Sequence, residues 1–174
     1  LVGVGLLYQE GFFRQMIDET GRQQEVFPYN DPTTLPIEPV LTAGGEWLRV
    51  PLAFPGRTLH VRVWQARVGR VTLYLLDTND PLNSPVDRGI TGKLYQGSKL
   101  VRFLQQVVLG IAGWRALVAM GLDVEICHLN EGHAAFAILE RARECMRRTG
   151  LSFREALWVT RAGNVFTTHT PVDE

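Results

Sequence analysis

The sequence lacks an excess of charge of either sign. Eighteen Lys and Arg residues balance eighteen Asp and Glu residues in a chain of 174, and the formal net charge is +0. Without a basic field, a protein has little electrostatic attraction for nucleic acid or for an anionic membrane surface. We therefore expect neither nucleic acid nor a membrane among its partners.

Cysteine is scarce, and long apolar runs are missing. Only Cys127 and Cys145 occur, too few for a disulfide scaffold and typical of a reduced compartment. The longest uncharged run inside the chain, Phe103 to Trp114, is shorter than the roughly 20 apolar residues of a membrane-spanning helix. Leu1 to Tyr8 is apolar but lacks the basic leader and cleavage site of a secretion signal. These features predict a cytoplasmic location.

The content of 45% hydrophobic and 21% charged residues is that of an ordinary folded domain. The chain opens without Met inside one strand pattern and stops directly after another, which is unusual for natural termini. We therefore expect a single incomplete domain over residues 1–174, truncated at both ends. Within it, residues 24–97 should form a loop and β-hairpin insertion, and residues 98–174 a helix followed by a βαβ unit.

The first half of the chain contains short strand patterns. Val2 to Leu7 predicts a buried strand, whereas Gly11 to Ile17 predicts a short helix with its apolar residues on one side. Alternation from Leu48 to Phe54 predicts a strand, and Pro51 confines it to a sheet edge. Residues Leu59 to Leu76 predict an antiparallel hairpin that turns near Gly69. Two intervening segments rich in Pro, Asn and Asp should be irregular, Glu25 to Gly45 and Asp77 to Tyr95.

The second half changes to helical periodicity. Ser98 can cap a buried helix that Gly121 ends, and Gly110 and Gly113 lie inside it where another backbone could approach closely. Val124 to Leu129 then predicts a short strand.

A βαβ unit follows from the remaining pattern. A helix is expected from His133 to Arg148. Its outer face should be exposed to water and should carry charge pairs spaced three residues apart, formed by Glu140, Arg143, Glu144 and Arg147. Ser152 and Glu155 form a capping-box pattern for a further helix, and Val165 to Thr168 predicts a strand. Because such crossovers are almost always right-handed, the two strands should run parallel.

Polar residues follow both strands of this unit. Asn130, Glu131, Gly132 and His133 come after the first, and His169 with Thr170 and Pro171 comes after the second. Ligands of open α/β sheets bind outside the carboxyl ends of the strands, so these residues should face one pocket. A helix beginning near His133 would add free backbone N–H groups. Such a set suits a polyhydroxyl ligand.

Two other interpretations of these residues have to be weighed. Asn130 could simply cap the helix, with Glu131 favouring its first turn and His133 packed as a structural residue. A metal site is disfavoured because His128 and His133 lack the spacing of two histidines on one helix face, and no second ligand cluster occurs. We therefore expect no metal.

Ordered motifs along nearly the whole chain are similar to the α-glucan (glycogen, starch and maltodextrin) phosphorylase family. They resemble its short bacterial and archaeal branch more than the animal glycogen phosphorylases. The motifs are Gly5 to Gln15, Leu75 to Asp80, Leu94-Tyr95, His128 to Phe136 and Phe166 to Val172. The resemblance implies an α/β fold, part of the N-terminal Rossmann-like domain of a two-Rossmann (GT-B type) glycosyltransferase, with an antiparallel β-hairpin excursion.

The family resemblance also implies a reaction. Such enzymes transfer the terminal α-1,4-linked glucosyl unit of a glucan to inorganic phosphate and release glucose 1-phosphate. By position, His169 matches the catalytic histidine whose main-chain carbonyl contacts the glucosyl residue. Glu131 and His133 match residues that line the sugar site, and Asn130 matches the neighbouring asparagine, expected to support the loop. The implied partners are the glucan and phosphate, with a homodimer possible for the full-length enzyme.

The implied cofactor is pyridoxal 5'-phosphate, which needs a lysine that this chain lacks. Its only lysines, Lys93 and Lys99, match no cofactor-bearing position, so no cofactor-binding residue is expected here and the isolated chain should be inactive. Gln106 and the Gln96-Gly97-Ser98 loop depart from the more acidic family pattern, and Val172-Asp173-Glu174 departs from its usual small residues. The alternative function is a non-catalytic carbohydrate-binding or interaction domain.

Overall fold

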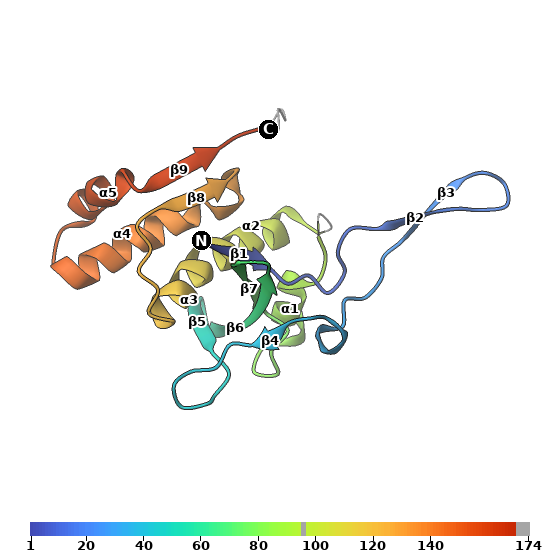
Figure 1. Ribbon diagram of the computed structural model, residues 1–174, viewed down its shortest axis with the longest axis horizontal. Coiled ribbons are helices and arrows are strands. Elements are labelled where there is room, and N and C mark those ends of the chain that lie inside the picture. The colour runs from blue at the N-terminus through green and yellow to red at the C-terminus, as the bar shows by residue number, and fades with distance from the viewer. Residues whose placement is uncertain (95–96, 170–174) are drawn as a thin grey trace. The chain divides into compact units, whose positions relative to one another are not determined.

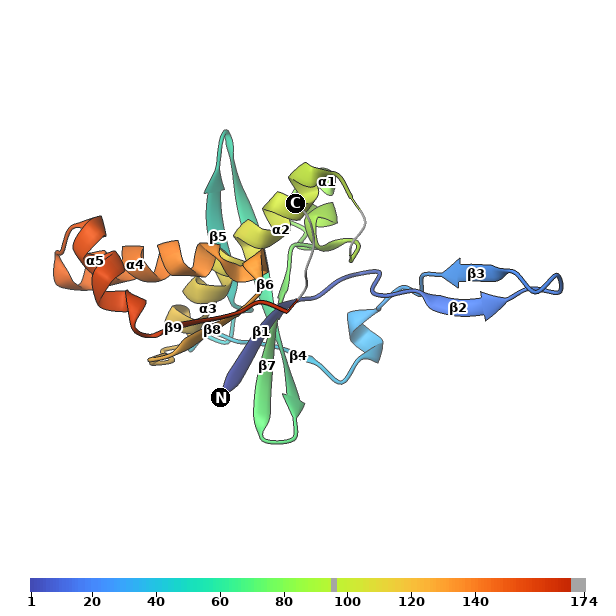
Figure 2. The same cartoon turned by 90° about the horizontal axis from the view of Figure 1, so that it is seen from above.

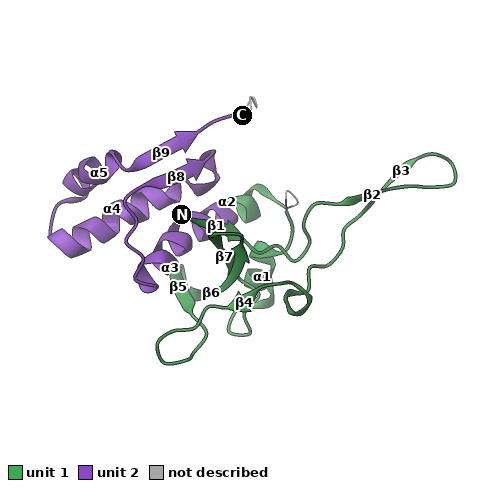
Figure 3. Ribbon diagram, viewed as in Figure 1, with its two compact units in different colours: residues 1–102 green, residues 103–174 purple. Residues whose placement is uncertain are grey.

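The computed structural model describes residues 1–94 and 97–169 and divides the chain into two compact units (Figures 1 and 3). Unit 1 comprises Leu1–Arg102 and unit 2 comprises Phe103–Glu174. Both units combine helices with strands, so the chain is α/β as predicted. Within the described residues, no helix is both long and apolar enough to cross a membrane.

Unit 1 is built on a mixed sheet. Its strands are β1 (Val2–Leu6), β4 (Glu38–Pro39), β5 (Arg49–Phe54), β6 (Arg57–Val68) and β7 (Val71–Asp77). The order is β1-β7-β6-β4, and β5 pairs with β6. Strand β1 runs parallel to β7, and the remaining pairs are antiparallel.

The predicted hairpin and edge strand are both confirmed. Strands β6 and β7 pair antiparallel, and Gly69 has φ 61 in the turn that joins them. Strand β5 pairs only with β6 among the described residues, so Pro51 lies on an edge, where its missing N–H is tolerated. Alternate residues of β6 and β7 form the core of the sheet, with Leu59, Val61, Val63 and Leu76 all 0% exposed.

The helix predicted from Gly11 to Ile17 is wrong. The segment contains β2 (Arg14–Ile17), which pairs antiparallel with β3 (Gln23–Val26) in a separate two-stranded hairpin (Figure 2). Asp18 Oδ1 accepts hydrogen bonds from the backbone N–H groups of Thr20 and Arg22, and Gly21 has φ 79. This turn chemistry favours a hairpin over the helix that a short apolar run suggested.

The other segments predicted as irregular contain short elements. Residues 25–45 hold the end of β3, the 3-10 helix η1 (Pro32–Thr34) and β4. Residues 77–94 hold α1 (Pro85–Arg88) and η2 (Gly89–Thr91). Ser84 caps α1 through a hydrogen bond from the Asp87 backbone N–H, and Pro85 occupies the first turn, where a proline needs no hydrogen-bond partner.

Ion pairs between buried carboxylates and partly exposed arginines fix the end of β7 and the segment that follows it. Asp77 pairs with Arg62 at 2.8 Å, Asp80 with Arg49 at 2.7 Å and Asp87 with Arg57 at 2.9 Å. We call these six residues the β7-end network. Each of the three carboxylates is at most 4% exposed, so every one meets an arginine where an unpaired charge would be costly.

Unit 2 contains most of the helical residues. The boundary between the units falls inside α2 (Lys99–Val107), which continues through the π-helical turn η3 (Val108–Ala112) into α3 (Gly113–Ala119). The remaining elements are β8 (Cys127–Asn130), η4 (Gly132–Ala134), α4 (Phe136–Thr149), α5 (Phe153–Arg161) and β9 (Asn164–Thr167).

The predicted long helix and its caps are confirmed, but its first turns are not buried, since Leu100 is 64% and Phe103 49% exposed. Ser98 Oγ accepts a hydrogen bond from the Val101 backbone N–H at 3.3 Å, and Gly121 follows the helix with φ 70. A Cβ atom placed on Gly110 would lie 2.7 Å from the backbone nitrogen of Ala137. The close approach predicted for Gly110 therefore exists, and it joins η3 to the start of α4.

The parallel βαβ unit is confirmed, with one correction to the exposed face of its helix. Strands β8 and β9 pair in parallel, and Ser152 and Glu155 form the capping box of α5. Glu140 does not face water: its side chain is 4% exposed and bonds to both Arg115 and Arg143 at 2.8 Å. Burial alone would raise the pKa of the Glu140 carboxyl, but the hydrogen bonds from the two arginines outweigh it and lower that pKa.

Candidate functional site

The carboxyl ends of β8 and β9 lie side by side because the strands are parallel and in register. Asn130, the last residue of β8, is opposite Thr167, the last residue of β9. The next backbone N–H, that of Glu131, donates to the Thr167 carbonyl oxygen at 2.9 Å. The loops after the two strands are thus joined at their beginning, as the crossover rule led us to expect.

Three of the four residues predicted for the site form one hydrogen-bonded cluster. Glu131 Oε1 accepts from the backbone N–H of His169 at 2.8 Å and lies 3.3 Å from the ring Nδ1. The ring Nε2 is 3.0 Å from Asn130 Oδ1. The side chain of His169 is 57% exposed and that of Glu131 only 17%. The carboxylate is therefore the inner member of the cluster and the imidazole the outer one.

His133 lies near this cluster in the sequence but is not bonded to it. It is an exposed residue of η4, and within residues 1–94 and 97–169 it shares no hydrogen bond with the other three. Thr170 and Pro171, which follow His169 in the same polar segment, lie outside the described residues.

The helix after β8 begins later than predicted. The 3-10 turn η4 comes first, and α4 starts at Phe136 rather than His133. The structure gives η4 no side-chain cap hydrogen bond, and Asn130 instead faces the ring of His169. The alternative interpretation, in which Asn130 caps the helix, is therefore not observed.

Two features of the site had no signal in the sequence analysis. Thr167 takes part through its carbonyl oxygen and also through its hydroxyl, which is 2.5 Å from His128 Nε2. Glu131 has φ 59 and ψ −173, a conformation adopted almost only by glycine. The strand register places Val165 opposite His128 and Thr167 opposite Asn130, so pairing alone would not have pointed to the contact between His128 and Thr167. Nothing in the sequence marks a strained glutamate.

The same region does not assemble a metal site from described residues. There, no group of three or more His, Cys, Asp and Glu side chains is placed to hold a metal ion. His128 is hydrogen-bonded to Thr167. Burial raises the pKa of the Cys127 thiol, partly opposed by the charge of Arg141, so this cysteine does not have the depressed pKa of a reactive thiolate.

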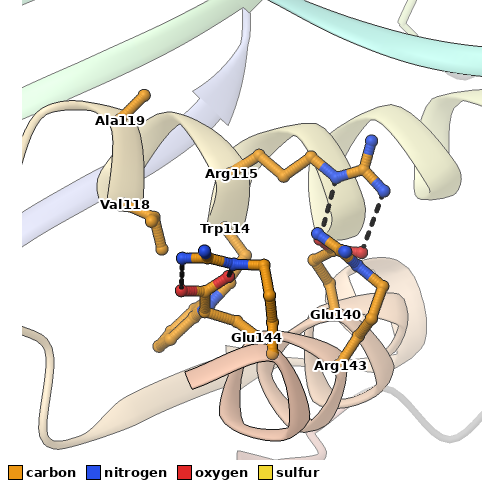
Figure 4. Close-up of a pocket in the computed structure, with 8 residues that line it drawn as sticks. Trp114, Arg115, Val118, Ala119, Glu140, Arg143 and Glu144 are labelled. Atoms are coloured by element: carbon orange, nitrogen blue, oxygen red, sulfur yellow. Dashed lines mark hydrogen bonds and ion pairs between the residues drawn. The ribbon is translucent and has the colours of Figure 1, made fainter.

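A separate cavity of about 190 Å³ lies between α3 and α4 of unit 2 (Figure 4). Figure 4 shows the guanidinium groups of Arg115 and Arg143 turned toward Glu140. Glu144 likewise pairs with Arg147 at 2.7 Å. The charged groups of this cavity are engaged with one another, and none of the residues predicted for the sugar site lines it.

Comparison with known proteins finds relatives along the whole chain. No family model matches it. Maltodextrin phosphorylase from Thermococcus litoralis is 46% identical over 172 residues, which are 99% of this chain and 21% of that protein. Glycogen phosphorylase from Mycobacterium tuberculosis is 42% identical over 178 residues, again 99% of this chain and 21% of the relative.

A less similar relative also matches nearly the whole of this chain but only a part of its own length. Glycogen phosphorylase from Aquifex aeolicus is 34% identical over 172 residues, covering 99% of this chain and 25% of that protein. The chain thus spans between a fifth and a quarter of the length of these three relatives.

Proposed function

Because this chain is homologous over its whole length to a segment of the maltodextrin and glycogen phosphorylases, we propose that it is part of an α-glucan phosphorylase. It would belong to the N-terminal Rossmann-like domain of a GT-B type glycosyltransferase. The complete enzyme transfers the terminal α-1,4-linked glucosyl unit of a glucan to inorganic phosphate and forms glucose 1-phosphate. We expect it in the cytoplasm, with a homodimer as its possible assembly.

The observation that carries this proposal is the meeting of Asn130, Glu131 and His169 at the ends of two parallel strands. Cleavage of a glycosidic bond develops positive charge at the anomeric carbon, and fixed oxygen dipoles stabilise such charge. The main-chain carbonyl of His169 would contact the glucosyl residue, while Glu131 and His133 line its site and Asn130 supports the loop. Hydroxyl groups of a sugar match this set of donors and acceptors.

The lysines of this chain do not fit pyridoxal 5'-phosphate, the cofactor implied by the family resemblance. Lys93 is exposed and ion-paired with Glu10 at 2.8 Å, and Lys99 is an exposed first residue of α2. A lysine that forms a Schiff base is instead activated by desolvation or by a neighbouring cation. We therefore propose that the cofactor's lysine lies outside these 174 residues and that the isolated chain does not catalyse phosphorolysis.

A chimera tests the proposal. The matching 172 residues of the Thermococcus litoralis enzyme are replaced by this chain, and release of glucose 1-phosphate from maltodextrin and phosphate is measured. We expect activity in the chimera and none in the isolated chain. His133→Ala should lower the chimera's rate sharply, whereas Glu144→Ala, which removes the α4 partner of Arg147, should leave it unchanged.

The opposite result favours the alternative function. A folded, soluble chimera without phosphorolysis, together with binding of maltodextrin by the isolated chain in calorimetry, would indicate a non-catalytic carbohydrate-binding domain. A chimera in which His133→Ala and Glu131→Ala keep the full rate would remove the assignment of these positions to the sugar site.

A further inference from the structure

Glu131 has a backbone conformation that needs support. It is the one non-glycine residue with positive φ in the described part of the chain, at φ 59 and ψ −173. This region is almost exclusive to glycine, and another residue persists there only when its surroundings hold it. The contacts of Glu131 should therefore reveal what the strained conformation achieves.

The backbone of Glu131 is held by the last residue of β9, and its side chain by the segment that follows β9. Its N–H donates to the Thr167 carbonyl oxygen at 2.9 Å, and its Oε1 accepts from the His169 N–H at 2.8 Å. The positive φ of Glu131 lets its backbone N–H and its carboxylate form these two hydrogen bonds at the same time. With 17% of its side chain exposed, Glu131 directs its Oε1 atom to a peptide group of its own protein.

Asn130 holds the other end of His169. Its Oδ1 lies 3.0 Å from the ring Nε2, while Glu131 Oε1 lies 3.3 Å from Nδ1. Both ring nitrogens therefore face polar side chains, and the imidazole is fixed although 57% of the side chain is exposed. We call Asn130, Glu131, Thr167 and His169 the His169 clasp.

We propose that Glu131 and Asn130 are positioning residues, which set the His169 peptide and ring, rather than groups whose main task is to contact the sugar. This rests on the proposed function and refines it, since Glu131 was assigned there to the lining of the sugar site. Orienting one peptide carbonyl is worth this support because an error of about 1 Å in a reacting group can lower a rate about 100-fold. The strain at Glu131 is the local cost of that orientation.

Hydrogen exchange of the His169 amide in the isolated 174-residue chain tests the clasp without any activity. By NMR, Glu131→Ala should speed exchange of this amide at least about tenfold, because a hydrogen bond to a charged acceptor is lost. Glu131→Gln keeps an oxygen acceptor and should stay within about threefold of the wild type. Asn130→Ala should shift the ring resonances of His169 with little effect on its amide.

The chimera supplies a kinetic readout. A positioning role predicts that Glu131→Ala lowers kcat more than it raises KM and that Glu131→Gln restores most of kcat. Glu144→Ala is the matched control, because it removes a glutamate of the same unit whose side chain is 18% exposed, much like that of Glu131, and is paired with Arg147. That variant should change neither the His169 amide nor kcat.

The outcomes separate the two proposals. If the wild-type His169 amide exchanges as fast as in Glu131→Ala, the clasp is wrong even when the chimera is active. If Glu131→Ala speeds exchange but the folded wild-type chimera has no activity, the clasp stands and the proposed function fails. An active chimera in which Glu131→Gln is as slow as Glu131→Ala would also overturn the positioning role, because the charge itself would then be required.

Discussion

Polar residues follow a parallel strand in both units, yet the two strand ends differ in exposure and strain. At and after the end of β7, the carboxylates of Asp77, Asp80 and Asp87 are at most 4% exposed and each is paired with an arginine. After β8 and β9, Glu131 is 17% exposed, His169 is 57% exposed, and Glu131 has a strained backbone.

The difference separates a structural polar network from a candidate site. The β7-end network uses its charges to fix α1 and the loop before it, which leaves the carboxylates little contact with solvent. The His169 clasp keeps its imidazole outside and accepts a strained residue, a combination found more often at functional sites than in stable scaffolds. Carboxylates after a parallel strand therefore do not by themselves indicate a ligand site.

The largest effect is expected from breaking the β7-end network. Asp80→Ala leaves Arg49 without its buried partner and removes the oxygen that accepts the Leu82 backbone N–H, so unfolding should become easier by about 3 kcal/mol. Urea unfolding of the whole chain measures this change. Asp31→Ala, which removes the side-chain cap of η1 and no ion pair, is the control and should cost clearly less. Equal losses in the two variants would contradict the structural importance of the buried pair.

The next effect concerns the close packing of η3 against the start of α4. Gly110→Ala places a Cβ 2.7 Å from the Ala137 nitrogen and from the Phe136 Cβ, so α4 must shift and stability should fall by about 2 kcal/mol. Gly132→Ala is the control, since a Cβ there meets nothing within 4 Å. Thermal unfolding of both variants checks the prediction, which fails if Gly110→Ala melts with the wild type.

Acid should weaken the β7-end network. The hydrogen bond from Arg57 lowers the pKa of Asp87, and at Asp80 burial raises the pKa but is outweighed by bonds from the Leu82 N–H and Arg49. A depressed pKa adds stability above the ordinary value of 3.8, and this stability is lost as pH falls through the folded-state value.

Urea titrations at a series of pH values from about neutral to about pH 2.5 test the acid prediction. The unfolding free energy of the wild type should decline below about pH 4. Asp80→Asn combined with Asp87→Asn should be less stable at neutral pH and show a flatter decline. An identical slope in the double variant would assign the acid sensitivity to other groups.

The smallest effect tests the strain at Glu131. Glu131→Gly relieves the backbone and Glu131→Ala does not, so the glycine variant should be more stable than the alanine variant by about 1 kcal/mol. Both lose the carboxylate, which isolates the backbone contribution. At Glu155, in the ordinary capping box of α5, the order should reverse, because alanine favours a helix over glycine. If Glu131→Ala is as stable as Glu131→Gly or more stable, the backbone at Glu131 is not strained.

The sequence predicts best where one local rule determines the structure. The Ser152 and Glu155 capping box, the hairpin through Gly69 and the parallel strands around Asn130 all follow from spacing. It fails at Arg14 to Ile17, where the apolar run favoured a helix although Asp18 and Gly21 carry the local turn chemistry of a hairpin. It also fails where a distant residue decides, because Glu140 is buried only since Arg115 reaches it from α3. No sequence pattern announces that partner.

The site shows the same division. Its location follows from the rule that parallel strands end at the same edge, which brings Asn130, Glu131 and His169 together. That rule does not predict in which direction each of these three side chains points. The inward turn of Glu131 depends on a single backbone angle, and nothing in the residue type of a glutamate predicts a positive φ.

The central claim, that this strand end is the sugar site of an α-glucan phosphorylase, is tested most directly by phosphorolysis in the chimera with the Thermococcus litoralis enzyme. The wild-type chimera should release glucose 1-phosphate from maltodextrin, and Glu131→Ala should reduce kcat about 100-fold relative to Glu144→Ala. A folded chimera in which Glu131→Ala and Glu144→Ala release glucose 1-phosphate at the same rate would contradict the claim.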